Sequence, residues 1–372
     1  MFLFDGLYAQ MFSELFSDLT ALAHVLKRMI LAFSVSFLGA AIITPPLIRY
    51  LKKLKLEQVF RDSKEVRDLA AFHSPKAHTP TMGGIIIVAA TLLGTAVAVH
   101  WNTQVVIALC SYLLCAAIGV IDDLAKIRAK SVKGMPGRIK LLIQLIASAA
   151  IIMALRSFPD LLKQYAAVPI PFTDQYLTIL PLIWLIIFLF FVLAGTSNSV
   201  NLTDGLDGLA TGCAMPVLLF LIVVSLATGH ARTAILISST SIPGNGELAV
   251  ICAAVLGALV AFLWHNTYPA AIFMGDTGSL SLGALIGIIA FLTNHPLHLV
   301  IAGGIFVIEA LSDILQVFSY KFFNKRRIFK MAPLHHHFEL SGYHETKITV
   351  RFVIVSGFLS WIGCIGLHAF WS

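Results

Sequence analysis

Ten hydrophobic stretches alternate with short polar segments along this chain, and nearly all are long enough to cross a lipid bilayer. They lie near residues 29–50, 82–100, 104–121, 140–156, 178–195, 206–228, 247–265, 279–293, 297–320 and 350–370. Because hydrocarbon offers no partner to a free backbone N–H or C=O group, such stretches predict helices. The stretch at 279–293 is short, and its boundaries are the least sharply marked. The pattern predicts an all-α, polytopic integral membrane protein with ten transmembrane helices.

The composition agrees with this class. The chain is 58% hydrophobic and only 12% charged, which is too apolar for a soluble domain. It contains no repeat, no low-complexity tract and no long linker. We therefore expect residues 1–372 to form a single integral-membrane domain.

The basic residues predict how the helices are oriented. If the spans alternate in direction, 21 of the 26 Lys and Arg residues fall on one side, within 49–76, 126–140 and 321–351. Basic loops are retained in the cytoplasm, so this side is predicted to be cytoplasmic, with both termini on the outer (periplasmic or extracellular) side. Lys27 and Arg28, at the outer end of the first span, run against this rule.

The net charge of +7 does not indicate binding to nucleic acid. The basic residues flank membrane spans, where anionic headgroups and the orientation rule account for most of them. The remaining positive charge can steer phosphate-bearing substrates toward the cytoplasmic side. Membrane lipids are expected partners, and nucleic acid is not.

The five predicted cytoplasmic loops carry the chain's conspicuous polar motifs. Acids and histidines that converge at one membrane surface indicate that these loops form an active site. The motifs that point to this surface are Asp122-Asp123, the segment Asn198 to Gly208, the segment Phe273 to Ser279 and the segment His335 to Glu339.

Asp122 and Asp123 stand at the predicted cytoplasmic end of the third span. The helix dipole is negative there and two adjacent carboxylates repel each other, so a cation should compensate them. Lys126 and Arg128 would do so at an ordinary solvated helix end. The further acidic motifs on the same side favour a metal-binding or catalytic role instead.

The segment Asn198 to Asp207 has a polar residue at every third position, namely 198, 201, 204 and 207. This spacing predicts one polar side of a helical turn where the sixth span begins. The free N–H groups at that helix start are suited to an anion. A capping role for Thr203 or Asp204 would explain one such residue well and four poorly.

Asp276 is the leading candidate for a metal ligand. Its glycine-rich surroundings predict a tight turn that presents one carboxylate beside open backbone amides. Hard oxygen ligands of this kind favour Mg²⁺, which is commonly shared between one or two carboxylates and substrate phosphates. Standing alone, the motif would suit an ordinary aspartate in a glycine turn.

The last cytoplasmic loop contains three consecutive histidines among basic residues. They lack the helical spacing of a zinc site and have no cysteine partners, so contact with phosphate or proton handling is the favoured role. The ninth span adds polar residues at helical spacing, which are expected to line the cleft beneath the loops. These residues are Glu309, Asp313 and Gln316.

Together the motifs resemble those of the phospho-N-acetylmuramoyl-pentapeptide transferases, over nearly the whole chain. The acidic motifs are shared across polyprenyl-phosphate sugar-phosphate transferases, whereas the triple-histidine loop preceded by Met-Ala-Pro is similar to the muramoyl branch. The segments that carry the resemblance are Thr79-Pro-Thr-Met-Gly-Gly84, Gly119-Val-Ile-Asp-Asp123, Asn201-Leu-Thr-Asp-Gly-Leu-Asp-Gly208, Asn266-Thr-Tyr-Pro269, Phe273-Met-Gly-Asp-Thr-Gly-Ser279 and Met331-Ala-Pro-Leu-His-His-His-Phe-Glu339.

The resemblance implies an Mg²⁺-dependent reaction in the bacterial cytoplasmic (inner) membrane, with the active site facing the cytoplasm. Phospho-MurNAc-pentapeptide would pass from UDP-MurNAc-pentapeptide to undecaprenyl phosphate, giving UMP and lipid I, the first lipid-linked precursor of peptidoglycan. Whether an aspartate first attacks the sugar phosphate or only activates the lipid phosphate stays open, and direct attack by the lipid phosphate is favoured. The resemblance is also compatible with a homodimer, for which no interface is predicted.

The same resemblance implies roles for individual residues. The catalytic set is Asp122, Asp123, Asp276 and His335, with Asp276 as the metal ligand. The substrate-binding set is Lys76, Asn198, Asp204, Asp207, Asn266, Phe273, Gln316 and His336.

Three other functions compete with this one. A GlcNAc-1-phosphate transferase would use similar acidic loops but a different histidine pattern in the last loop. A transporter or lipid flippase would place its polar groups near the midplane, often on broken helices related by repeats. A structural scaffold would not need repeated Asp-Gly motifs. The clustering of acids at one face favours a transferase.

Overall fold

Each predicted hydrophobic stretch coincides with a helix or a bent helix pair in the structure, a computed structural model that describes residues 2–54, 79–129, 134–179, 181–237 and 239–367. In this part of the chain, eight helices are long and apolar enough to span a membrane, or nine if one bent pair counts as a single span. A shorter apolar helix, α3, covers another predicted stretch. The chain is thus an all-helical polytopic membrane protein.

The elements follow one another from the N-terminus as helices, with one small hairpin between α6 and α7. They are α1 (Phe2–Lys53), α3 (Gly84–Ala98), α4 (Thr103–Ala129), α5 (Gly137–Leu155), α6 (Pro159–Tyr165), β1 (Ala167–Pro169), β2 (Tyr176–Thr178), α7 (Leu182–Thr203), α8 (Leu209–Thr228), α9 (Ala231–Leu236), α10 (Gly246–Asn266), α11 (Gly275–Leu292), α12 (Pro296–Ala302), α13 (Gly304–Phe322), α14 (Leu334–Glu339) and α15 (Glu345–Ile365).

Helix α11, which corresponds to the short predicted stretch at 279–293, lies at the centre of the bundle. Every residue from Asp276 to Leu292 is buried, and the helix packs against α3, α4 and α7. The outer helices α1, α5 and α15 are mostly exposed and carry large apolar side chains on their surfaces. This distribution suits a protein whose outer surface faces lipid rather than water.

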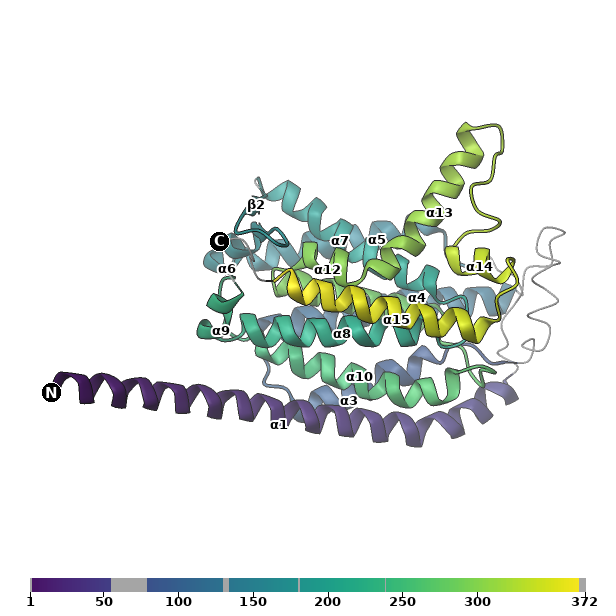
Figure 1. The fold of residues 1–372 in the computed structure, drawn as a ribbon. Coiled ribbons are helices and arrows are strands. Elements are labelled where there is room, and N and C mark those ends of the chain that lie inside the picture. The colour runs from purple at the N-terminus through teal and green to yellow at the C-terminus, as the bar shows by residue number, and fades with distance from the viewer. Residues whose placement is uncertain (1, 55–78, 130–133, 180, 238, 368–372) are drawn as a thin grey trace.

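The two ends of the bundle differ. Figure 1 shows that α1 begins and α15 ends at the same end, which also carries α6, α9 and the hairpin, while α14 lies at the other end. Strands β1 and β2 pair antiparallel, with Val168 opposite Leu177. The hairpin is the one addition to the predicted all-α architecture within the described residues.

The ninth predicted stretch is not a straight span. Helices α12 and α13 meet at an angle of 82°, and α13 projects out of the bundle (Figure 1). The bend falls at Gly303 and Gly304, and adjacent glycines are among the usual causes of a sharp helix kink.

Arg28, an exception to the predicted orientation rule, is explained by an ion pair inside the bundle. Its guanidinium binds the carboxylate of Glu247 at the start of α10. The N–H group of His100 also donates to this carboxylate, at 2.8 Å. Arg28 therefore joins α1 to α10, and its position reflects this contact rather than the distribution of charge between loops.

Replacing Arg28 by Met is expected to lower the free energy of unfolding by about 3 kcal/mol, because Glu247 would stay buried without its cation. The adjacent Lys27 is exposed, so Lys27→Met should change it by less than ~0.5 kcal/mol. Thermal unfolding of both variants in the same detergent checks this expectation. Equal midpoints for the two variants would contradict it.

Candidate active site

The two adjacent aspartates lie inside α4, and the helix end predicted at these residues is wrong, since α4 runs on to residue 129. Two ammonium groups neutralise Asp122 within this helix. Lys126 Nζ lies 2.7 Å from Oδ2 of this carboxylate, and Lys140 Nζ lies 2.8 Å from Oδ1. The N–H group of Met135 also donates to Oδ1, at 2.7 Å. The prediction that a cation compensates these acids is confirmed, with Lys126 and Lys140 as the cations. The alternative of solvated acids at a helix end is wrong, because both aspartates are buried.

Asp276 faces Asp122 across the same two lysines. Lys126 Nζ lies 2.8 Å from Oδ1 of Asp276, and Lys140 Nζ lies 2.9 Å from Oδ2. Gly275 precedes this residue with a φ of +72°, a conformation that glycine adopts without strain. Asp276 nevertheless lies in the first turn of α11, and its N–H group donates to Asp123, so the predicted tight turn with open backbone amides is wrong. Two ammonium groups bridge two buried carboxylates.

Asp123 holds the beginning of α11. Its Oδ1 atom accepts a hydrogen bond of 3.1 Å from the N–H group of Asp276, and Oδ2 accepts from the N–H and hydroxyl groups of Thr277 at 3.0 and 2.7 Å. The first N–H groups of a helix have no partner within the helix, and a carboxylate is favoured at this positive end. Asp123 therefore sets the position of Asp276 relative to α4.

The segment before α3 supports the Asp276 turn from another side. The N–H groups of Gly83 and Gly84 donate to the carbonyl oxygens of Phe273 and Met274, both at 2.8 Å. The N–H group of Phe273 donates in turn to the carbonyl of Pro80 at 2.9 Å. Two motifs far apart in the sequence thus pair through their backbones.

Glycines bring α3 and α4 into backbone contact with α11. A Cβ atom on Gly119 would lie 2.3 Å from the carbonyl oxygen of Asp276, and one on Gly84 would lie 2.1 Å from the backbone nitrogen of Gly278. Backbone cannot move aside as a flexible side chain can, so these positions require glycine. The spacing of the three helices beneath the acids depends on them.

The segment Asn198 to Asp207 does not form one helical face, so this prediction is wrong. Helix α7 ends at Thr203, and Asp204 is its C-cap. Helix α8 begins only after Gly208, which has a φ of +71°, so both aspartates lie in a turn between two helices. The glycines of the motif interrupt the helical spacing. The alternative role of Thr203 or Asp204 as N-cap of the next helix does not hold either, since the N-cap of α8 is Gly208.

Asp204 lies among the other acids. It accepts a hydrogen bond from the N–H group of Gly275, and burial raises its pKa to about 7, with the carboxylates of Asp276, Asp123 and Asp207 adding to the rise. This carboxyl group therefore takes up a proton at a higher pH than an ordinary aspartate does.

Asp207 and Asn266 shape the loop that leads to α11. Asp207 Oδ2 accepts from the N–H group of Ala270 at 2.9 Å, and its own N–H group donates to Glu345 Oε1 at 2.6 Å. Asn266 Nδ2 donates to the carbonyl of Ile272 at 2.9 Å. Both predicted substrate-binding side chains thus hold the protein's own backbone in this structure.

The three histidines form the short helix α14. His335 is fully buried, and its Nδ1 atom lies 2.9 Å from Glu309 Oε2 on α13. His336 Nδ1 lies 2.7 Å from Glu339 Oε2, and burial lowers the pKa of His336. Glu309 is buried against His335, whereas the prediction that Glu309, Asp313 and Gln316 together line a cleft beneath the loops stays a prediction.

The remaining predicted substrate-binding residues are bound to other parts of the protein or fall outside the described residues. Gln316 donates to the carbonyl of Phe329 and accepts from the N–H groups of Ile328 and Phe329, each at 3.0 Å. Asn198 Nδ2 donates to a carbonyl of its own helix α7 at 2.7 Å. Lys76 falls outside the described residues, so its predicted role is not tested.

The donor set fits a small, hard cation. Asp122, Asp123 and Asp276 are all buried, and each offers an oxygen such that these atoms lie within 4.8 Å of one another. Carboxylate oxygens are the ligands that Mg²⁺ prefers. Since Lys126 and Lys140 already bind two of these carboxylates, a metal ion would share the acids with them.

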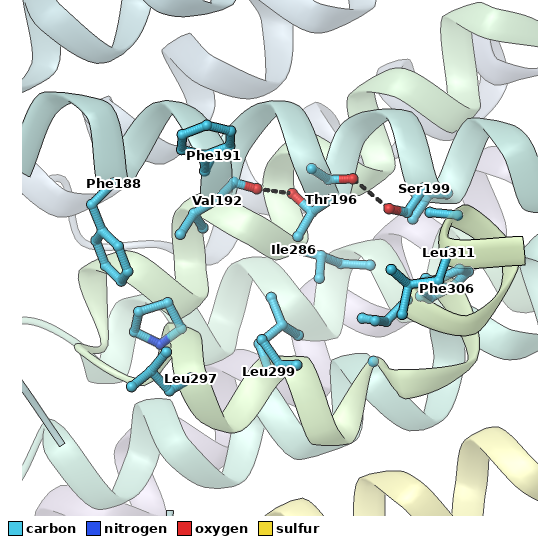
Figure 2. Close-up of a pocket in the computed structure, with 17 residues that line it drawn as sticks. Phe188, Phe191, Val192, Thr196, Ser199, Ile286, Leu297, Leu299, Phe306 and Leu311 are labelled. Atoms are coloured by element: carbon cyan, nitrogen blue, oxygen red, sulfur yellow. Dashed lines mark hydrogen bonds between the residues drawn. The ribbon is translucent and has the colours of Figure 1, made fainter. Parts of the chain in front are cut away.

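An apolar cavity of about 350 Å³ lies between α7, α11, α12 and α13. Phe188, Leu297, Leu299 and Phe306 are among the side chains that line it (Figure 2). The hydroxyls in its wall bind carbonyls of their own helix, as Thr196 does with Val192 at 2.8 Å (Figure 2). The wall therefore presents almost no free polar group.

Three residues that support the acids were not identified from the sequence. Each contacts an aspartate far away along the chain. Lys140 binds Asp276, Thr277 donates to Asp123, and Glu345 accepts from the N–H group of Asp207. Thr277 lies inside a motif that was recognised, and Lys140 is one of the basic residues of a predicted cytoplasmic loop. No local spacing connects either of them to its partner.

Comparison with known proteins agrees with these motifs. The glycosyl transferase family 4 profile matches residues 105–294, and the phospho-N-acetylmuramoyl-pentapeptide-transferase signature 1 matches residues 76–88. That signature covers the segment that pairs with the Asp276 turn.

Full-length relatives show the same similarity. A phospho-N-acetylmuramoyl-pentapeptide-transferase of Thermodesulfovibrio yellowstonii is 45% identical over 370 residues, which cover 98% of this chain and 99% of the relative. Another, of Methylacidiphilum infernorum, is 42% identical over 94% of this chain and 95% of its own length. A third, of Brachyspira hyodysenteriae, is 38% identical over 94% and 96%. The chain belongs to the phospho-N-acetylmuramoyl-pentapeptide-transferase family.

Proposed function

We propose that this chain transfers phospho-MurNAc-pentapeptide from UDP-MurNAc-pentapeptide to undecaprenyl phosphate, forming lipid I and releasing UMP. The family membership, at 45% identity over nearly the full chain, supports this activity. The single structural observation that carries it is the buried cluster of Asp122, Asp123 and Asp276, bridged by two lysines. Phosphoryl transfer needs charge neutralisation and positioning more than covalent chemistry, and this cluster is built for both.

Within the cluster the residues have different roles. Asp276, with Asp122, would hold Mg²⁺, which supplies neutralisation of the diphosphate and of the departing UMP. Lys126 and Lys140 place two fixed positive charges where phosphate oxygens can bind. Asp123 acts by holding the first turn of α11, so that Asp276 keeps its position.

The apolar cavity offers a place for part of the prenyl chain. Its wall is formed by aliphatic and aromatic side chains, and its hydroxyls are bound within their own helices. An isoprenoid chain loses no hydrogen bond on entering such a space and gains contact with apolar surface. The phosphate of the lipid substrate would then reach the acids from within the membrane.

The membrane arrangement completes the proposal. We place the protein in the bacterial cytoplasmic membrane with ten crossings, the α12–α13 pair and the short α3 each counting as one. The excess of basic residues on the side of the acidic cluster supports a cytoplasmic active site. A homodimer stays compatible with this arrangement, and its interface is not assigned.

An activity assay with two donors tests the function. Detergent-purified protein is incubated with undecaprenyl phosphate, Mg²⁺ and either UDP-MurNAc-pentapeptide or UDP-GlcNAc, and both UMP release and lipid-linked product are followed. We expect product from the muramoyl donor alone, lost with EDTA. Turnover of UDP-GlcNAc would contradict the donor assignment, and inactivity toward both donors in a folded sample would contradict the transferase function.

A further inference from the structure

The start of α15 holds the turn between α7 and α8 by its backbone. The buried carboxylate of Glu345 accepts a hydrogen bond of 2.6 Å from the N–H group of Asp207, and the hydroxyl of Thr349 donates to the Asp207 carbonyl oxygen at 3.2 Å. Residues four apart in a helix lie on the same face, so one face of α15 binds both backbone polar groups of a single residue in the turn.

This turn holds both ends of the segment that leads to Asp276. Asp207 Oδ2 accepts from the N–H group of Ala270 at 2.9 Å, and Asp204 accepts from the N–H group of Gly275. Gly275 immediately precedes Asp276 in the sequence. A shift of the turn would therefore be passed on to the carboxylate that faces the two lysines.

Contacts to the middle of the same segment come from other helices. Asn266, at the end of α10, donates to the carbonyl of Ile272 at 2.9 Å. Gly84, at the start of α3, donates to the carbonyl of Met274 at 2.8 Å. These contacts fix the segment against α10 and α3, whereas its two ends are held by the turn that α15 supports.

We infer that Glu345 is a positioning residue for the transfer reaction, which acts through Asp207 on the segment before Asp276. The inference rests on the proposed transferase function, in which Asp276 acts at the diphosphate. In this role Glu345 touches neither the substrate nor Asp276. Phosphoryl transfer depends on how accurately its charged groups are placed, so loss of this support should slow the chemical step more than it weakens substrate binding.

The test compares Glu345→Ala with wild type in the UMP-release assay. Alanine leaves the buried N–H group of Asp207 without this acceptor, which is costly, so the turn should shift. We expect kcat to fall about 10- to 100-fold, with KM for both substrates within about twofold. Glu345→Gln keeps an acceptor oxygen at the same distance from the backbone, so its kcat should lie within about threefold of wild type.

Ser356→Ala is the matched control for stability. Its buried hydroxyl also joins α15 to α8, through a hydrogen bond of 2.8 Å to the Cys213 carbonyl oxygen, but it lies about three helical turns further from the acids along α15. This variant should lower the unfolding midpoint in the same detergent without changing kcat. If kcat fell in proportion to the unfolding midpoint in both alanine variants, Glu345 would only support the fold and the inference would be overturned.

Thr349→Val tests the same support from the carbonyl side of Asp207, and it carries the test if Glu345→Ala does not fold. Valine has nearly the shape of threonine but no hydroxyl to donate, so we expect kcat to fall about threefold at unchanged KM. Normal kcat in the variant that carries the test, or a kcat of Glu345→Gln as low as that of Glu345→Ala, would overturn the inference. Inactive wild type would overturn the transferase function instead.

Discussion

Replacing Asp276 by Asn is expected to lower kcat about 1,000-fold or more while the protein stays folded. Asn has nearly the same shape, but it removes the negative charge that both lysines contact and that a divalent cation requires. The carboxylate of Asp122 would still bind Lys126 and Lys140, so neither ammonium group would be left without a partner. The measurement is Mg²⁺-dependent release of UMP by the purified variant.

The matched control for this variant is Asp174→Asn, the same change at an exposed position in the hairpin, which should keep wild-type activity. Thermal unfolding of both variants establishes that they fold. Near-normal turnover by Asp276→Asn would remove Asp276 from the metal site and would leave Asp122 and Asp123 as the remaining candidates.

Gly119→Ala should lower both the stability and the activity of the protein. The added methyl group would meet the carbonyl oxygen of Asp276 at 2.3 Å and the Cα atom of Thr277 at 2.5 Å. These are backbone atoms, so α4 and α11 would have to separate, and overpacking of this kind costs about 3 kcal/mol. Separation would also carry Asp276 away from Asp123, so UMP release should fall together with the unfolding midpoint.

Gly357→Ala provides the comparison, because this glycine lies in α15 and a Cβ atom there would meet nothing within 4 Å. That variant should be as stable as wild type, or more stable by about 0.5 kcal/mol through helix propensity. If Gly119→Ala unfolds at the same temperature as Gly357→Ala, the backbone contact between α4 and α11 does not limit stability.

Much of the fold follows from hydrophobic length alone, because the hydrocarbon excludes unpaired backbone and leaves helices as the available structure. The same sequence pattern does not reveal the bend at Gly303 and Gly304, since glycines are common in membrane helices and only neighbouring packing decides whether they kink. The prediction of one helical face from Asn198 to Asp207 was also wrong. Polar residues at every third position occur in a helix, but they can equally lie in a turn between two helices, as Asp204 and Asp207 do here.

The candidate site could be located but not assembled from the sequence. Acidic motifs on one side of the predicted spans correctly brought Asp122, Asp123 and Asp276 together. Lys140 and Thr277 provide contacts that hold these acids. Contacts between residues so far apart in the chain produce no periodic pattern in the sequence from which they could be predicted. The negative charge of the adjacent carboxylates predicts a nearby cation, but it does not identify the residue that provides it.

Helix α13, which follows the bend, contributes to two different sites from one stretch of about two turns. Phe306, Val307, Ala310 and Leu311 line the apolar cavity, while Glu309 binds His335. A helix of this length behaves as a stiff rod, so its wall residues and its carboxylate move together rather than separately. A shift of α13 that widens the cavity would therefore also move the carboxylate that binds His335.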